Sequence, residues 1–191
     1  MTVKIVLASG SPRRRELLRM IGFEDFEVVP DAANEEMPEG LSPEGTVCHI
    51  ALQKANNVSL LRGAGDLIIA ADTLVYLDGR PLGKPADHGD AARMLEALSG
   101  RMHTVFTGVA LKRGSGHMVG AEATNVYFRE LSGREISDYV ATGEPMDKAG
   151  AYGAQGRGAV YVERIEGDFF NVMGFPLCRL SKMLKDFGFP M

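Results

Sequence analysis

Apolar residues follow two different spacings along the chain, and the change between them predicts an alternation of strands and helices. Short apolar runs bounded by turn residues are typical of strands, while apolar residues three and four positions apart are typical of helices. The predicted strands are residues 4–8, 26–29, 67–71 resumed at 74–77, 103–112, 118–129, 159–165 and 169–173. The predicted helices are residues 13–21, 42 to about 62, 87–98, 132–141 and 176–187. Helices alternate with strands early and strands cluster later, which predicts an α/β fold with a mixed sheet flanked by helices.

The first predicted helix follows a strand through the small polar segment Ser9-Gly10-Ser11-Pro12. Ser11 is a suitable N-cap, and proline fits the first helical position. Free backbone N–H groups and the positive end of the helix dipole meet there, so the segment predicts an anion site with phosphate as the expected anion. We expect at least one of Arg13 and Arg14 to bind that anion, while Arg15 fits a solvated helix face. The segment matches neither a Walker A loop nor a GxGxxG loop.

Asp72 is the most informative position, because it interrupts an apolar run that predicts a strand buried on both faces. A carboxylate in such a strand is costly unless a metal, a cation or a functional proton compensates it, and the alternative is an aspartate that caps a loop. Lys54 falls on the apolar stripe of the second predicted helix. It either extends its ammonium group to solvent or meets a buried anion, and Asp72 on the neighbouring strand favours the second. The Asp78-Gly79 turn predicts a hairpin that folds Lys84 back toward Asp72.

Composition bounds the class of protein. The chain has 191 residues, of which 45% are hydrophobic and 24% charged, and this is ordinary for a globular protein. Its length suffices for one domain, or for one domain with a subdomain, and we expect a single domain over residues 1–191. The formal net charge of −4 argues against a general nucleic-acid binder, so an anion site must be a local cluster of cations. Two cysteines without a CxxC spacing predict neither a disulfide framework nor a zinc site. With no run long enough to span a membrane and no signal peptide, we expect a cytoplasmic protein.

Two irregular segments leave alternatives open. Residues 31–40 are acidic, and they are either a solvated loop or a source of carboxylate ligands. Residues 146–158 are rich in glycine and alanine, and they either let the backbone approach another group closely or form a plain surface loop. The four histidines are scattered, and we expect each to be structural or solvent-facing.

Six motifs in order along the chain resemble those of the Maf family of nucleoside triphosphate pyrophosphatases. They are Leu7-Ala8-Ser9-Gly10-Ser11-Pro12-Arg13-Arg14-Arg15-Glu16-Leu17-Leu18, Ala71-Asp72-Thr73, Gly83-Lys84-Pro85, Leu98-Ser99-Gly100-Arg101, Asp147-Lys148-Ala149-Gly150-Ala151-Tyr152 and Asn171-Val172-Met173-Gly174-Phe175-Pro176-Leu177. The resemblance covers nearly the whole chain. It implies an inosine-triphosphatase-like fold with a mixed twisted sheet and two lobes around a cleft, often as a homodimer. It also implies hydrolysis of a nucleoside triphosphate to the monophosphate and pyrophosphate with Mg²⁺ or Mn²⁺.

The resemblance also implies roles for individual residues. Asp72 matches the proton acceptor and Glu35 a cleft residue that serves the metal, while Asn34 stands where many members carry a second acidic residue. The carboxylates of Glu35 and Asp72 could together hold a divalent ion through oxygen atoms. Arg13, Thr73 and Gln155 match the residues that set specificity for the base, and Lys54 and Lys84 match cleft residues that serve the metal and the phosphates. From their charge alone, Arg13, Arg14, Lys54 and Lys84 are the local cations that can hold a triphosphate. Oxygen ligands suit the hard ions Mg²⁺ and Mn²⁺.

Within the family, the chain resembles the branch that acts on dTTP and UTP. The branch that acts on 7-methyl-GTP typically carries Trp in place of Arg13 and Ser-Asp-Gln in place of residues 71–73, and neither is present here. That branch is the nearest alternative. The alternative from another class is a non-catalytic nucleotide-binding regulator of septum formation, against which the intact Asp72, Lys54 and Lys84 argue.

Overall fold

The computed structural model describes residues 3–31 and 37–189. Its strands are β1 (Ile5–Leu7), β2 (Glu27–Val28), β3 (Leu67–Leu77), β4 (Arg80–Leu82), β5 (Met102–Arg113), β6 (Gly116–Phe128) and β7 (Val162–Glu166). Its α-helices are α1 (Pro12–Met20), α2 (Pro43–Ser59), α3 (His88–Leu98), α4 (Gly133–Val140), α5 (Phe169–Val172) and α6 (Leu177–Asp186). Short 3₁₀ helices are η1 (Glu144–Asp147), η2 (Ala149–Ala151) and η3 (Arg157–Tyr161).

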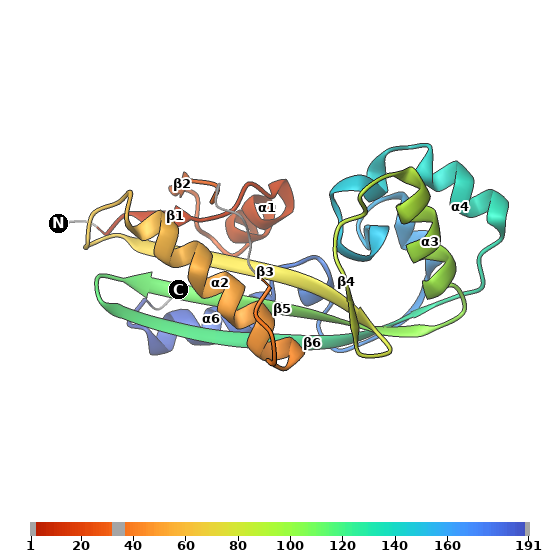
Figure 1. The fold of residues 1–191 in the computed structure, drawn as a ribbon. Helices are drawn as coiled ribbons and strands as arrows, with labels where there is room; N and C mark the ends of the chain where they lie inside the picture. The colour runs from red at the N-terminus through yellow and green to blue at the C-terminus, as the bar shows by residue number, and fades with distance from the viewer. Residues whose placement is uncertain (1–2, 32–36, 190–191) are drawn as a thin grey trace. The chain divides into compact units, whose positions relative to one another are not determined.

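Within the described residues, the strands form a seven-stranded mixed sheet, as the sequence predicts (Figure 1). The strand order is β2-β1-β3-β5-β6-β7, and β4 pairs with β3 off this path. The chain divides into two compact units. Unit 1 comprises Met1–Asp72, Thr107–Glu122 and Gly174–Met191, and unit 2 comprises Thr73–Phe106 and Ala123–Met173. That residues 1–191 act as a single domain stays a prediction.

In unit 1, helix α2 packs against the sheet through small and branched side chains. Its buried Ala51, Ala55 and Val58 form one core cluster with residues of β1, β3 and β5. A glycine in β5 permits the close approach: a Cβ on Gly108 would lie 2.2 Å from the backbone oxygen of Val47 in α2. Because backbone atoms cannot yield as a flexible side chain does, Gly108 sets how near α2 sits to the strand. The position of α2 matters because this helix carries Lys54.

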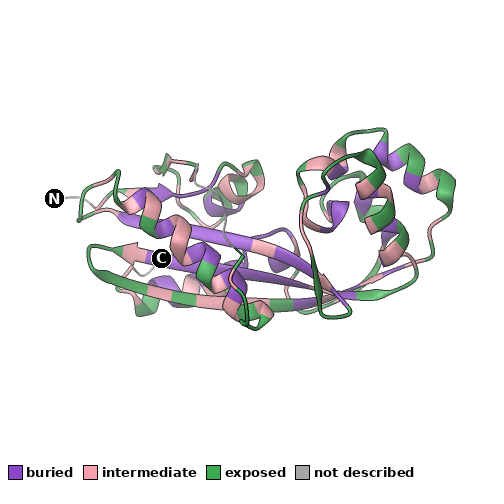
Figure 2. Cartoon of the chain, viewed as in Figure 1, coloured by how far each residue is buried: buried purple, intermediate pink, exposed green. Residues whose placement is uncertain are grey.

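Strand β3 is continuous over 11 residues, so the apolar runs 67–71 and 74–77 belong to one strand that carries Asp72 in its interior. Figure 2 shows β3 and β5 buried over most of their lengths. The predicted hairpin after β3 is confirmed, since Leu77 pairs with Arg80 in the antiparallel β3–β4 ladder. Asp78 and Gly79 both have positive φ, 50° and 74°, as the tight hairpin turn demands.

Unit 2 has its own core. Helices α3 and α4 contact each other, and α3 also contacts η1 and η2 (Figure 1). Buried residues of these elements pack with residues of β3, β5 and β6 in one cluster that includes Leu95, Ile136, Tyr139 and Tyr152. The predicted capping box at Ser132 is confirmed, because Ser132 and Glu135 exchange side-chain to backbone hydrogen bonds at the start of α4.

Three predicted elements are wrong in type or extent. Residues 169–173 form no strand: the Asp168 side chain accepts a hydrogen bond from the Phe170 backbone N–H, and this cap starts the short helix α5. Residues 159–161, predicted as the start of a strand, belong to η3, so β7 begins at Val162. Helix α2 ends at Ser59, three residues before the predicted end. The other predicted helices and strands are confirmed, with shifts of one or two residues at their ends.

Candidate active site

A buried ion pair lies at the point where β3 carries its carboxylate. Asp72 is 6% exposed, and its Oδ1 accepts a hydrogen bond from Lys54 Nζ at 2.7 Å. The side chain of Lys54 is 12% exposed, so both charges are largely removed from water. The prediction that Lys54 meets a buried anion is therefore confirmed. A buried pair of this kind compensates charge that would otherwise be very costly to bury.

The second oxygen of Asp72 is different. Oδ2 is buried and, among the described residues, has no hydrogen-bond partner. A buried carboxylate oxygen normally has at least one partner, so a functional explanation is called for. Lone pairs on Oδ2 can accept a proton or bind a hard cation, while Lys54 occupies Oδ1.

Arg14 ties three segments of unit 1 together. Its Nε donates to the backbone oxygen of Gly174 at 2.8 Å, and its Nη1 donates to the backbone oxygen of Ala71 at 2.8 Å and to Ser9 Oγ at 3.2 Å. Ala71 directly precedes Asp72. The guanidinium thus connects the start of α1, the interior of β3 beside Asp72 and the motif at Gly174. The sequence predicts Arg14 as a phosphate-binding residue, and it does not indicate this bracing function.

The start of α1 has the predicted cap. Ser11 Oγ accepts from the Arg14 backbone N–H at 3.5 Å, and the Ser11 backbone N–H donates to Ser9 Oγ at 3.3 Å. Arg13 lies in the first turn of α1 and is half-buried. Its assignment as a base-contacting residue stays a prediction.

The remaining predicted substrate contacts, Thr73, Lys84 and Gln155, belong to unit 2. Lys84 and Gln155 are exposed, and Thr73 is half-buried in β3. Two of their segments are joined within that unit, because the Gly150 N–H donates to the Gly83 backbone oxygen at 3.0 Å. A Cβ on Gly150 would lie 3.0 Å from Val75, so the glycine-rich segment does let the backbone approach another element closely.

A divalent cation fits one part of this arrangement. The buried Oδ2 of Asp72, which has no hydrogen-bond partner within residues 3–31 and 37–189, is a hard oxygen ligand of the kind that Mg²⁺ and Mn²⁺ prefer. The other predicted ligand, Glu35, and the neighbouring Asn34 lie outside the described residues. In the part of the chain that the structure describes, no three His, Cys, Asp or Glu side chains are grouped to hold a metal ion.

The histidines occupy the places that the sequence predicts. His49, His88 and His117 are exposed. His103 is 1% exposed, and its Nε2 lies 2.8 Å from the hydroxyl of Tyr152. Burial lowers the pKa of His103 to about 4, so its ring is neutral at neutral pH.

Comparison with known proteins agrees with the motifs. The family model described as Maf-like protein matches residues 4–187. The chain belongs to this family. The confirmed family membership supports transferring the motif assignments residue by residue, as proposals for the individual side chains.

Relatives cover nearly the whole chain. A protein of Symbiobacterium thermophilum named dTTP/UTP pyrophosphatase is 50% identical over 188 residues, covering 98% of this chain and 96% of the relative. Proteins with the same name from Acetivibrio thermocellus and Bacillus pumilus are 51% identical over 194 residues and 44% identical over 185 residues. Those alignments cover 97% of this chain in both cases, and 96% and 97% of the relatives.

Solved structures confirm the expected fold. The Staphylococcus aureus Ham1 protein matches with a TM-score of 0.54 and 15% identity, covering 96% of this chain and 98% of that one. A HAM1 protein from Coxiella burnetii matches with a TM-score of 0.52 and 18% identity, covering 97% and 100%. In the described part of the chain, no helix is long and apolar enough to cross a membrane.

Proposed function

We propose that this protein is a nucleoside triphosphate pyrophosphatase that hydrolyses dTTP and UTP to the monophosphate and pyrophosphate. The observation that carries the proposal is the buried Asp72 with Lys54 on one oxygen and a second oxygen without a partner among the described residues. Its relatives at 44–51% identity bear the name of this activity over nearly their full lengths.

Asp72 is the general base in the proposed reaction. Water attacks the α-phosphorus, one proton of the water passes to Oδ2 of Asp72, and the bond from the α-phosphorus to the bridging oxygen breaks as pyrophosphate leaves. Positioned bases of this kind contribute about 100- to 10,000-fold to rates. Lys54 fixes the carboxylate through Oδ1, so Oδ2 is the oxygen that remains for the proton. Direct attack needs no covalent intermediate.

Cations are required because a triphosphate carries about four negative charges, which strong charge-assisted hydrogen bonds can hold. We assign the phosphates to Lys54, Lys84 and Arg14, and the base to Arg13, Thr73 and Gln155. The chain as a whole has a net charge of −4, so these local cations, with a metal, must supply the attraction.

Asp72 and Glu35 are the proposed ligands of a divalent cation, Mg²⁺ or Mn²⁺. When bound, such an ion polarises a phosphoryl oxygen and lowers the pKa of a bound water. The base contacts match a pyrimidine edge, since uracil and thymine present two carbonyls and one N–H, to which an arginine can donate and a glutamine can both donate and accept. We also expect the protein to act in the cytoplasm and to bind no nucleic acid; a homodimer remains an expectation from the resemblance.

A pyrophosphate-release screen tests the proposal. Purified protein is assayed with dTTP, UTP, CTP, GTP and 7-methyl-GTP, with Mg²⁺ and Mn²⁺ in separate series and EDTA as the control. We expect the highest kcat/KM for dTTP and UTP, with monophosphate and pyrophosphate as the products in equal amounts. A preference for 7-methyl-GTP would overturn the substrate assignment and keep the reaction type. Release of orthophosphate, or no turnover of any nucleotide, would overturn both.

A further inference from the structure

A loop in unit 2 wraps around the carboxylate of Glu144. Oε2 of Glu144 accepts a hydrogen bond from the Arg157 backbone N–H at 3.1 Å, and Oε1 accepts one from the Gly158 backbone N–H at 3.3 Å. Glu144 is the first residue of η1, and it lies 13 and 14 residues before its two backbone partners. The loop therefore depends on a side chain that is distant in sequence.

Tyr139 completes the arrangement from helix α4. Its hydroxyl donates to Glu144 Oε1 at 2.9 Å and accepts from the Gly153 backbone N–H at 3.1 Å. Tyr139 is buried, so its hydroxyl is held away from bulk water. Gly153 and Arg157 lie on either side of Gln155, and their amides are held by the same pair of side chains. We call Glu144 and Tyr139 the loop anchor.

Two glycines of the loop lie too close to the loop anchor for any larger residue to fit. A Cβ on Gly156, whose φ is 153°, would lie 2.6 Å from Glu144 Oε1. A Cβ on Gly158 would lie 2.6 Å from the Tyr139 hydroxyl and 2.9 Å from the Gly153 backbone oxygen. Such distances are impossible for a real side chain, so glycine at both positions is what lets the loop close over the anchor.

Neighbouring groups fix the backbone at Glu144 and keep its side chain ionised. Lys148 Nζ donates to the Glu144 backbone oxygen at 2.6 Å and to Asp147 at 2.6 Å, which fixes η1. Burial acts to raise the pKa of Glu144, but its hydrogen bonds outweigh that effect and leave the pKa lowered. The group is therefore a carboxylate at neutral pH, and hydrogen bonds to a charged acceptor are stronger than those between neutral groups.

Gln155 is exposed at the centre of this anchored loop. We infer that Glu144 and Tyr139 are positioning residues that fix the Gln155 segment and thereby set the selectivity for the nucleotide base. The inference rests on the proposed function, in which Gln155 contacts the base. A glutamine side chain loses much conformational freedom when it binds a ligand. If the backbone that carries it is already fixed, binding does not have to order the backbone as well, and the total entropic cost is lower.

The test compares kcat/KM for UTP and CTP, whose bases differ at one edge: uracil presents a carbonyl and an N–H there, and cytosine presents an amino group and an acceptor nitrogen. In Glu144→Gln the side chain keeps its size, but one acceptor oxygen becomes an NH₂ that cannot accept from the loop amides. A misplacement of 1 Å can cost ~100-fold, and we expect the ratio of UTP to CTP to fall by about a tenth of that, roughly 10-fold, because Glu144→Gln keeps one acceptor oxygen for the loop. The loss should lie mainly in KM for UTP. Tyr139→Phe removes the hydroxyl's bonds to Glu144 Oε1 and to the Gly153 N–H but leaves the Arg157 and Gly158 amides bonded to Glu144, so we expect a smaller fall in the same direction.

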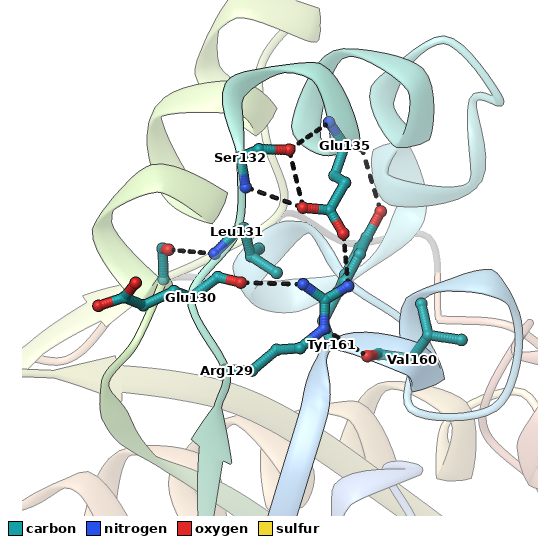
Figure 3. Close-up of polar contacts among 8 residues, drawn as sticks. Arg129, Glu130, Leu131, Ser132, Glu135, Val160 and Tyr161 are labelled. Carbon is teal, nitrogen blue, oxygen red and sulfur yellow. Dashed lines mark hydrogen bonds and ion pairs between the residues drawn. The ribbon is translucent and has the colours of Figure 1, made fainter.

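The same unit offers a matched control in a second anchored carboxylate. Figure 3 shows Glu135 bonded to Arg129 and to Ser132, while Arg129 also donates to the backbone oxygens of Glu130 and Val160. The bond from Arg129 Nη2 to Glu135 Oε1 is 2.6 Å long. Bonds from Arg129 and Ser132 lower the pKa of Glu135 to about 2. Glu135→Gln therefore disturbs a charged network beside η3 but leaves the Gly153, Arg157 and Gly158 amides with their partners. We expect its UTP to CTP ratio to equal that of the unsubstituted protein.

A double-substitution cycle decides whether Glu144 acts through Gln155. If it does, Glu144→Gln changes the ratio in the unsubstituted protein but adds nothing in a Gln155→Ala background. An equal fall in both backgrounds, or an unchanged ratio in both Glu144→Gln and Tyr139→Phe, overturns the inference. A parallel fall in Glu135→Gln would also overturn it, since the effect would then be general to the unit.

Amide hydrogen exchange separates this inference from the proposed function, because it needs no turnover. We expect residues 153–158 to exchange faster in Glu144→Gln than in the unsubstituted protein or Glu135→Gln. If no nucleotide is hydrolysed, the proposed function fails, and the inference that Glu144 and Tyr139 set base selectivity fails with it. If instead the amides of residues 153–158 exchange at the same rate in Glu144→Gln as in the unsubstituted protein, the anchoring of the loop by Glu144 is overturned.

Discussion

Replacing Asp72 with asparagine should abolish turnover while leaving the fold intact. Asparagine keeps the shape of the side chain and can still accept from Lys54, but its amide has no basic oxygen to take the proton of the attacking water. Losing a general base costs at least ~100-fold in kcat. That factor corresponds to roughly 2.7 kcal/mol in the barrier, at about 1.4 kcal/mol for each tenfold change.

The same substitution has a calculable effect on stability, which must be separated from the effect on chemistry. Asp72→Asn leaves the Lys54 ammonium largely buried without its counter-charge, and breaking a buried pair from one side costs about 3–5 kcal/mol. For a chain of this size each kcal/mol lowers Tm by about 2–4 °C, so we expect a Tm lower by roughly 6–20 °C. Turnover should accordingly be measured well below the Tm of the variant, after circular dichroism has confirmed its fold.

The decisive assay adds a second substitution. In the double variant Asp72→Asn with Lys54→Met the unpaired charge is gone, so part of the lost stability should return. Single-turnover release of pyrophosphate from dTTP should stay at least ~100-fold slow. Asp78→Asn, which removes one partner of an exposed pair with Arg101, serves as the control and should change neither rate nor Tm appreciably. An Asp72→Asn protein that keeps most of its kcat, or a double variant that regains it, would refute Asp72 as the base.

Three further substitutions, at Lys84, His103 and Gly108, have expected results. Lys84→Ala should lower kcat/KM for every accepted nucleotide by a similar factor, and a changed ratio of dTTP to GTP turnover would make Lys84 a base contact instead. Burial lowers the pKa of His103 from 6.5 to about 4, so the unfolded chain binds a proton more readily than the folded protein. The free energy of unfolding should therefore drop by about 3 kcal/mol as the pH decreases from above 6.5 to below 4. Urea titrations should show that this dependence on pH disappears in His103→Gln. Gly108→Ala should destabilise by about 1–3 kcal/mol or more because its Cβ would lie 2.2 Å from the Val47 oxygen, whereas Gly116→Ala, with its nearest contact at 3.6 Å, should be nearly neutral by thermal unfolding.

The pairing of Lys54 with Asp72 could be predicted because both residues break a hydrophobic pattern at places where the pattern itself implies burial. A lysine on the apolar stripe of a helix and a carboxylate in a buried strand each need compensation, and they lie on adjacent elements of the chain. Their contact at 2.7 Å follows from this shared requirement. By contrast, the bonds from Arg14 to backbone oxygens could not be predicted from the spacing of apolar residues. An arginine near the start of a helix looks the same in the sequence whether it binds an anion or donates to the backbone.

The loop anchor shows why the rest could not be predicted. Glu144 stands in a polar segment next to glycine and proline, where a carboxylate normally faces solvent, and nothing local marks it as a partner of amides 13 and 14 residues later. The same limit explains residues 159–161, whose apolar pattern fits a strand but which follow the anchored amides into η3. In the loop anchor, hydrogen bonds to a carboxylate distant in sequence outweigh the local preference, because bonds to a charged acceptor are strong while β-propensity differences amount to only about 1 kcal/mol. Because the conformation of this loop depends on a carboxylate distant in sequence, a single substitution of that carboxylate can make the loop mobile. Glu144→Gln measures how strongly the loop depends on it.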